Sequence, residues 1–358
     1  LAGLDLVALA TVADVAALRG LNRAFVAKGL MVMRNRERVG LSALLDAARV
    51  DGPPRPYHLG FVLGPRINAG GRIGDAALGA RLLTLRDPVE AARIAAELDR
   101  LNGERQALER IVLEEAAAEA DRQLMRSNRL SCLVVAGEDW HPGIVGIVAS
   151  RLKDKFKIPA FVIGRKGEVC SGSARASSGV DLGRAVRRAV EEGLILKGGG
   201  HALAAGVTLA PDRIEAFRAF MNLALEEEVA RARAGDALLV DGALSARGAV
   251  LDLARDIERA GPFGSGNPEP LFVFPDHRVV DARLVGADHI RVRLQSGDGA
   301  RLDAIAFRAA GNEIGDALTR GRGGLLHVAA RVGTSLFRGA ERTDIRIVDL
   351  ARPDREMS

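Results

Sequence analysis

Four short stretches of the sequence combine glycine or serine with a basic side chain, a combination that suits contact with phosphate. The clearest is KGGGHALAAG at 197–206, in which three glycines precede His201. Glycine allows positive φ and close approach of the backbone to a ligand, so Gly199 and Gly200 predict a loop that closes on a ligand beside His201. The alternative is a structural histidine, with the small residues after it packed beneath a neighbouring element. The glycines favour the ligand-facing interpretation.

A second stretch, FVLGPRINAGGRIGDA at 61–76, places Asn68 and Arg72 around an Ala-Gly-Gly turn. The backbone N–H groups of such a turn can bind an anion, and the guanidinium of Arg72 can form two parallel hydrogen bonds to a phosphate. The alternative is a glycine turn in which Arg72 forms an ion pair with Asp75. Short glycine motifs do not by themselves decide between the two.

The remaining two stretches also suit anions. WHPGIVGIVASRL puts Trp140 and His141 directly before a predicted helix, and a helix N terminus presents unpaired N–H groups to an anion. The alternative makes Trp140 a packing anchor, which is the better explanation of that residue, and His141 a helix cap. In SGSARASSGVDL (171–182), serines including Ser173 flank Arg175, either around a phosphate or in a solvated polar hairpin. Together, the four stretches predict phosphate chemistry.

A long helix is predicted between the second and third of these stretches. Apolar residues recur with helical spacing from Asp87 to about Arg126, and no proline interrupts them. Asp87 suits the N-cap, Pro88 the first helical position and Glu90 a capping box. About 38 residues at 1.5 Å each give a rod of roughly 57 Å, so we expect it to join two domains.

The segment after this helix predicts an α/β domain. Strand-like runs alternate with helical ones, in the order LSCLVVAG, GIVGIVASRLKDKF, PAFVIG, EVCSGSARAS, a helix from Asp181, AAGVTLA and a helix from Asp212. Loops of such a domain are expected to carry its chemistry.

Beyond Gly235 the pattern changes to strands. About five strand-like runs with turns between them, and a short helix at 312–318, predict a small barrel such as an OB-fold, which often binds single-stranded nucleic acid. Four phenylalanines could form a stacking platform there or the barrel core: Phe272, Phe274, Phe307 and Phe337.

Composition narrows the class of protein. The length of 358 residues predicts two or three domains. Cys132 and Cys170 are the only cysteines, which excludes a disulfide framework and a thiolate zinc cluster and favours a cytoplasmic location. The net charge of +5 suits a polyanionic partner, although only six of the 51 basic residues are lysine.

The opening run LAGLDLVALATVADVAAL is interrupted by Asp5 and Asp14. It therefore predicts neither a signal peptide nor a membrane span, and we expect no membrane partner. We interpret it as the middle of a longer protein.

The order of the motifs resembles the RecJ family of single-strand-specific exonucleases, within the DHH phosphoesterase superfamily. The motifs are DLVALATVADVAAL, PRINAGGR, LDRLNGERQ in the long helix, WHPGIVGIVASRL, GSARASSGVDL, GGGHALAAG and PFGSGNPEP, and they cover nearly the whole chain. GGGH alone is shared with oligoribonucleases, cyclic-dinucleotide phosphodiesterases and the alanyl-tRNA synthetase C-terminal module. PRINAGGR, PFGSGNPEP and the terminal barrel narrow the resemblance to RecJ.

The resemblance implies an α/β fold class with four parts. Residues 1–86 would be the end of a DHH catalytic domain, 87–126 the connecting helix, 127–234 a DHH-associated substrate-binding domain and 235–358 an OB-fold. It also implies a phosphodiesterase that degrades single-stranded DNA from the 5′ end, in DNA repair and recombination. A single-strand-binding protein is a candidate partner.

The resemblance also implies roles for particular residues. Asp14 matches a metal ligand of a Mn²⁺ or Mg²⁺ site in a two-metal hydrolysis. Arg175 and His201 match residues that line the nucleotide path, with His201 close to the reaction, and Asn68 and Arg72 match the NAGGR segment.

The chain departs from the family pattern in one respect. It contains neither an Asp-x-Asp motif nor two adjacent histidines, which supply most metal ligands in the family. We therefore expect the carboxyl-terminal part of such an enzyme, inactive by itself. The alternatives are a non-catalytic single-strand-binding or partner-docking module, and a relative acting on oligonucleotides or cyclic dinucleotides, which would not need the barrel.

Overall fold

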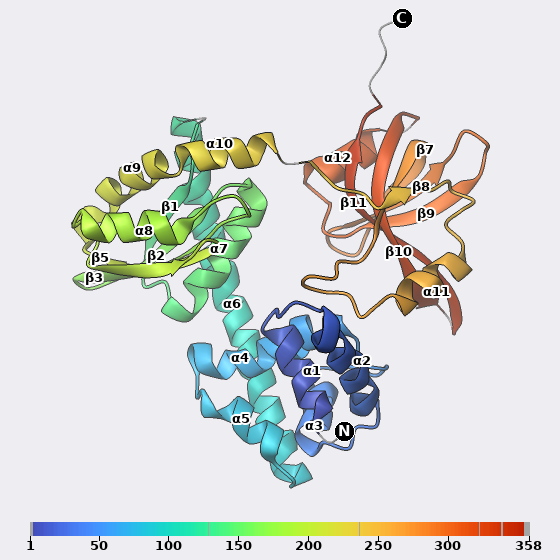
Figure 1. The fold of residues 1–358 in the computed structure, drawn as a ribbon, viewed down its shortest axis with the longest axis horizontal. Helices are drawn as coiled ribbons and strands as arrows, with labels where there is room; N and C mark the ends of the chain where they lie inside the picture. Colours follow the sequence, from blue (N-terminus) through green and yellow to red (C-terminus); the bar gives the residue numbers. More distant parts are fainter. Residues whose placement is uncertain (1–2, 128, 236, 322, 338, 354–358) are drawn as a thin grey trace, which may run out of the picture. The chain divides into compact units, whose positions relative to one another are not determined.

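The computed structural model describes residues 3–127, 129–235, 237–321, 323–337 and 339–353. The chain divides into two compact units, which are described separately (Figure 1). One contains Leu1–Asn35, Pro53–Gly60 and Leu238–Ser358, and the other contains Arg36–Gly52 and Phe61–Ala237. Along the parts described, no helix combines the length and apolar character needed to cross a bilayer.

The second unit is organised by the long helix α6 (Pro88–Arg126), as the sequence predicts. The Asp87 side chain accepts a hydrogen bond from the Val89 N–H at 2.9 Å, which caps the helix. Glu90 does not complete a capping box, because its carboxylate instead accepts hydrogen bonds from Arg93 and Arg81.

The first half of α6 packs on α3 (Val39–Ala47), α4 (Gly64–Ile73) and α5 (Ala77–Thr84). A π-helical segment, η1 (His58–Leu63), precedes α4. The Ala-Gly-Gly turn expected in NAGGR is therefore wrong, since this segment lies inside α4. A Cβ at Gly70 would lie 2.6 Å from the Asp75 carbonyl oxygen, so glycine lets the chain fold back tightly after α4.

The second half of α6 contributes to the core of a five-stranded sheet. The strands, in the order β1-β2-β3-β5-β4, are Leu133–Glu138, Ala160–Lys166, Val169–Arg175, Ala204–Leu209 and Lys197–His201. β1 and β2 are parallel and the other neighbours antiparallel. The expected GGGH loop is thus wrong in its backbone, because KGGGH forms the edge strand β4.

Helices cover the two faces of this sheet unequally (Figure 1). α7 (Pro142–Phe156) packs on β2 and β3, whereas α8 (Leu182–Glu191) packs on β4 and β5. The short 3₁₀ helix η2 (Pro211–Arg213), α9 (Ile214–Ala224) and α10 (Glu226–Ala234) complete the unit. Since the main sheet contacts of α7 are with β2 and β3, no helix of the described part of this unit covers β5 and β4 on that side.

The first unit contains α1 (Leu4–Ala13), α2 (Gly20–Arg34) and a barrel. The barrel strands β7 to β11 are Leu271–Val285, His289–Gln295, Arg301–Ala306, Leu325–Phe337 and Ala340–Ala351, and β10 pairs with both β7 and β11. α12 (Glu313–Arg320) lies between β9 and β10. The predicted α/β fold class with a closed OB-type barrel is confirmed.

The sequence did not predict α1 and α2, nor, in the barrel part, α11 (Leu251–Arg259) and the short strand β6 (Gly242–Ala243). The PFGSGNPEP motif follows α11 and is bonded to the loop between α1 and α2. The Ser265 carbonyl accepts a hydrogen bond from the Leu18 N–H at 2.6 Å, and the Gly266 carbonyl accepts one from Arg19 Nε at 2.8 Å. This motif therefore has a structural role that its sequence did not reveal.

Candidate nucleic-acid interface

The register of three antiparallel strands brings four of the predicted residues onto one face of the sheet. Arg175 on β3 pairs with Ala204 on β5, which pairs with His201 on β4. Ser173 and Gly199 are joined in the same way through Gly206. Residues paired across a ladder point to the same face, and neighbouring strands lie about 4.8 Å apart. Arg175 and His201 are thus separated by about two strand spacings.

This face forms an open strip over β5 and β4. A Cβ at Gly199 would meet no atom within 4 Å, and one at Gly206 would come no closer than 3.9 Å to another atom. The next row along the strip pairs Ser171 with Thr208 and Thr208 with Lys197. The open strip is therefore a flat surface of polar backbone with basic side chains at both ends.

Each of the three glycines before His201 has a different structural environment. A Cβ at Gly198 would lie 2.5 Å from Val186 on α8, so this glycine lets the strand pack on the helix. Gly200 has φ +154°, and a Cβ there would lie 2.6 Å from the Ala205 Cα. Gly199 has no such neighbour, so the packing of the protein does not explain it.

His201 is exposed at the end of β4, so the alternative of a packed structural histidine is wrong. The turn after it is held in place by two backbone hydrogen bonds. The Leu203 carbonyl accepts from the Ala176 N–H and the Ala202 carbonyl from the Leu182 N–H, both at 3.0 Å. His201 is thus an exposed side chain on an anchored hairpin.

Arg175 lies where α7 meets the open strip. Its Nη1 donates to the Ser173 hydroxyl at 2.9 Å and to the Ala174 carbonyl at 2.8 Å. A Cβ at Gly146 on α7 would lie 3.2 Å from Arg175 Nη2, so the guanidinium is enclosed on one side by the helix. Burial, followed by the positive charge of Arg72, lowers the pKa of Arg175.

Arg72 is the second half-buried arginine of this region. Its Nη1 donates to the Gly143 carbonyl at 2.8 Å, whereas the Asp75 carboxylate accepts from the Ala77 N–H, so the expected alternative of an Arg72–Asp75 ion pair is wrong. Burial and the charge of Arg105 lower the pKa of Arg72, and Glu109 opposes them. Asn68 lies one helical turn earlier on α4 and is exposed.

Neither Arg72 nor Arg175 forms an ion pair with a carboxylate among the residues described. Half-buried cations that repel each other and lack a carboxylate partner create a positive potential that an anion would relieve. The electrostatics of the two arginines therefore suit a phosphate group.

The N terminus of α7 does not present free N–H groups, contrary to expectation. His141 Nδ1 accepts from the Gly143 N–H at 3.0 Å, and the His141 carbonyl accepts from the N–H groups of Ile144 and Val145. His141 is an exposed N-cap. Trp140 is buried and donates from Nε1 to the Glu115 carboxylate at 2.7 Å, which confirms it as a packing anchor.

The predicted metal ligand does not lie in a metal-binding cluster. Asp14 is exposed at the C-cap of α1, in the other unit. Within the described ranges, no three histidine, cysteine or acidic side chains come together as a metal site would require. The residues present thus do not fit a two-metal centre.

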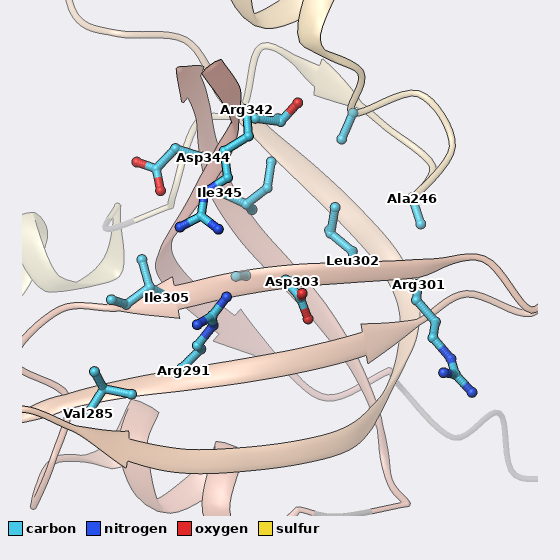
Figure 2. A pocket seen from close by; sticks show the side chains of 13 residues that line it. Ala246, Val285, Arg291, Arg301, Leu302, Asp303, Ile305, Arg342, Asp344 and Ile345 are labelled. Carbon is cyan, nitrogen blue, oxygen red and sulfur yellow. The ribbon is translucent and has the colours of Figure 1, made fainter. Parts of the chain in front are cut away.

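The barrel has a polar pocket of about 350 Å³ between β9 and β11 (Figure 2). Arg291 and Arg342 extend into one side of it, and Arg301 lies at the other end (Figure 2). Asp303 also lines the pocket, but Arg293 Nε donates to it at 2.8 Å and lowers its pKa. Asp344, the other carboxylate of the pocket, lies 3.4 Å from Arg346 Nε. The pocket therefore presents several guanidinium groups and two carboxylates that each already have an arginine partner.

The barrel phenylalanines divide between core and surface. Phe274 is fully buried and Phe272 packs against the core, whereas Phe307 is exposed and makes an edge contact with His289 at 5.1 Å between ring centroids. The side chain of Phe337 lies outside the described residues. Of these three described phenylalanines, Phe307 is therefore the one whose ring could stack on a base.

Sequence reasoning missed one part of this region. Asn102, Arg105 and Glu109 form a buried polar row on α6, and the charges of Arg105 and Glu109 act on Arg72. Their spacing of three and four residues in LNGERQALE could have predicted this row, since it places all three side chains on one helix face.

Comparison with known proteins identifies the parts of the chain. The family model of the DHHA1 domain matches residues 129–227, and that of the RecJ OB domain matches residues 240–349. The single-stranded-DNA-specific exonuclease RecJ of Dickeya dadantii is 38% identical over 312 residues, which cover 85% of this chain and 54% of that protein. RecJ of Thermus thermophilus is 33% identical over 98% of this chain and 48% of its own length.

Solved structures agree with these matches. The crystal structure of RecJ in complex with Mg²⁺ from Thermus thermophilus gives a TM-score of 0.81 at 31% identity, covering 98% of this chain and 52% of that chain. The corresponding Mn²⁺ complex gives 0.77, with 98% and 50% covered. The chain spans about half the length of the curated relatives it matches. On this evidence, the chain belongs to the RecJ family and contains that family's DHHA1 and OB domains.

Proposed function

We propose that this chain binds the substrate for a single-stranded-DNA exonuclease that cleaves phosphodiester bonds from the 5′ end. Residues 1–86 are assigned to the end of the catalytic domain, 87–126 to a connecting helix, 127–234 to substrate binding and 235–358 to a nucleic-acid-binding barrel. The enzyme would act in DNA repair and recombination in the cytoplasm, with a single-strand-binding protein as a candidate partner. Asp14 would contribute one carboxylate to a Mg²⁺ or Mn²⁺ site whose other ligands the described residues do not supply.

One observation carries the proposal, namely the open strip bordered by Arg72 and Arg175, which have no carboxylate partner in the described part of the chain. Arg175 and Arg72 would each bind a phosphate oxygen, with the Ser173 hydroxyl beside Arg175 and Asn68 on the exposed face of α4. Gly199 and Gly200 would let the DNA backbone lie against β4, and His201 would donate a hydrogen bond to the next phosphate. His141 keeps its Nε2 available, because its Nδ1 accepts the cap hydrogen bond.

The test is single-stranded DNA binding measured by fluorescence anisotropy at several salt concentrations. Arg175→Ala should weaken binding and lower the slope of log affinity against log salt by about 0.7, the value of one phosphate contact on a single strand. Arg100→Ala is the matched control, because Arg100 lies on the exposed face of α6 and pairs with Glu97 and Glu104. Equal losses in both variants would show that only general charge matters.

A second candidate, binding without hydrolysis, is favoured for the 358 residues by themselves. The sequence contains no Asp-x-Asp motif and no adjacent histidines. We expect the purified chain to bind single strands but to release no mononucleotides in the presence of Mn²⁺. Metal-dependent release that survives further purification would refute this expectation.

A further inference from the structure

The LDRLNGERQ segment of α6 does not form part of the open strip. It begins a row of buried polar side chains. Asn102 is 3% exposed, Arg105 is 7% and Glu109, one turn further on, is 8%. Arginine and glutamate are almost never buried to this degree unless they are paired. The three side chains therefore form an internal structure that sequence periodicity alone would not require.

The hydrogen bonds of this row fix the Arg105 guanidinium in one orientation. Arg105 Nη1 donates to Glu109 Oε2 at 2.7 Å, and Arg105 Nε and Nη2 donate to Asn102 Oδ1 at 3.3 Å and 3.1 Å. The second carboxylate oxygen of Glu109 accepts from Arg151 Nε of α7 at 3.2 Å. Glu109 thus joins α6 to α7 while it neutralises a buried arginine.

The row also acts on the phosphate-binding arginines. Beyond the effect of burial, which lowers both pKa values most, the charge of Arg105 lowers the pKa of Arg72 and the charge of Glu109 raises it. Arg72 in turn lowers the pKa of Arg175. α4 is pressed onto α6 at this level, since a Cβ at Gly74 would lie 2.9 Å from Leu101. Arg72 is therefore held near two other guanidinium groups, those of Arg105 and Arg175, with Glu109 as the carboxylate that offsets the repulsion from Arg105.

We infer that Glu109 is a positioning residue for phosphate binding: it holds Arg105 and Arg151 and keeps Arg72 directed at the Gly143 carbonyl, ready for a phosphate. The inference rests on the proposed function, in which Arg72 binds the DNA backbone. Without the Glu109 charge, Arg105 would be buried without a counter-ion, and its repulsion would displace Arg72 from the site.

The direction of the change in DNA affinity distinguishes a positioning role from a simple charge effect. Removing a carboxylate near an anion site makes the protein more positive, which by itself strengthens DNA binding. A positioning role predicts the reverse, because binding is lost although the net charge rises by one.

The experiment measures the affinity of the full chain for a fluorescent single strand, and its salt slope, for the parent and its variants. Arg72→Ala tests the proposed function. Glu109→Gln should weaken binding by about tenfold or more and lower the salt slope by about one contact, as Arg72→Ala does. The double variant should bind within about twofold of Arg72→Ala, because both changes remove the same contact. Glu104→Gln, which changes the charge equally on the exposed face of α6, should leave affinity unchanged or raise it.

A conservative variant keeps the inference testable if Glu109→Gln does not fold. Glu109→Asp retains the charge but is one methylene too short to reach both Arg105 and Arg151, so it should bind more weakly than the parent and more tightly than Glu109→Gln. Folding of each variant is checked by circular dichroism at the binding temperature. If Arg72→Ala weakens binding but folded Glu109→Gln, or in its place Glu109→Asp, binds at least as well as the parent, the positioning role is wrong and the proposed function stands. If Arg72→Ala itself has no effect, the assignment of Arg72 to phosphate binding fails, and the inference fails with it.

Discussion

Alanine substitutions in the GGGH strand should separate DNA binding from stability. Gly199→Ala adds a methyl group where no atom lies within 4 Å, in a strand conformation that alanine adopts readily. Replacing glycine at a compatible position reduces the entropy of the unfolded chain, so the free energy of unfolding should stay unchanged or rise by about 0.4–1 kcal/mol. The same methyl group occupies the open strip, so affinity for single-stranded DNA should fall, by about tenfold if it displaces one charged contact.

The neighbouring glycines provide the matched controls. At Gly198 the methyl group would lie 2.5 Å from Val186, and such overpacking costs about 1–3 kcal/mol. At Gly200 it would lie 2.6 Å from the Ala205 Cα at φ +154°, so backbone strain of about 1–3 kcal/mol adds to the overpacking. Both variants should unfold at lower denaturant concentration than the parent.

The assays are urea unfolding followed by circular dichroism, and anisotropy with a labelled single strand. We expect a stable Gly199→Ala protein that binds poorly, and Gly198→Ala and Gly200→Ala proteins that are destabilised. A Gly199→Ala protein that binds as well as the parent would refute the open strip as a DNA-binding surface. One that unfolds as early as Gly198→Ala would refute the structural account of the strand.

Three further predictions follow from single residues. His201→Ala should leave the melting temperature nearly unchanged, because the side chain is exposed. In an active full-length enzyme it should lower the single-turnover rate by a factor of about 10²–10³, as expected for loss of a preorganised hydrogen-bond donor. A variant that melts early and keeps its rate would contradict this prediction. Burial and the charge of Arg55 lower the pKa of His58, so as the pH falls His58 takes up a proton in the unfolded chain before it does so in the folded protein. The free energy of unfolding should therefore fall as the pH drops below about 6.5. Urea unfolding at pH 7 and pH 5 should show this loss in the parent and not in His58→Asn. Burial raises the pKa of Cys132 to about 12 and also raises that of Cys170. Neither thiol should therefore react with a disulfide reagent until the protein is denatured. Rapid reaction of the folded protein would contradict the burial of these cysteines.

Local signals in the sequence were enough to predict the long helix and the barrel. Asp87 and Pro88 are start signals that act within a few residues, and they place the beginning of α6 correctly. The barrel strands show the alternation expected when one face is buried, as in β9, where Leu302, Ala304 and Ala306 are buried. Both signals depend on neighbouring residues, so they can be recognised without the rest of the fold.

Glycine-rich segments were predicted poorly because distant contacts determine their structure. NAGGR is helical where Gly70 allows a close approach of Asp75, and KGGGH is a strand where Gly198 packs on Val186. Neither contact can be recognised from local propensity, which favours turns for both segments. The same limit applies to His141, whose capping hydrogen bond occupies the N–H group that the sequence offered to an anion.

Cross-linking of single-stranded DNA tests the central claim most directly. A strand carrying 5-iodouracil is bound to the chain and irradiated, and the cross-linked peptides are sequenced. The open strip predicts cross-links in the peptide of β4 that contains His201 and in the peptide of β3 that contains Arg175, and both should weaken in Arg175→Ala. Cross-links confined to the barrel strands, with none in β3 or β4, would contradict the claim that this face of the DHHA1 domain binds the DNA.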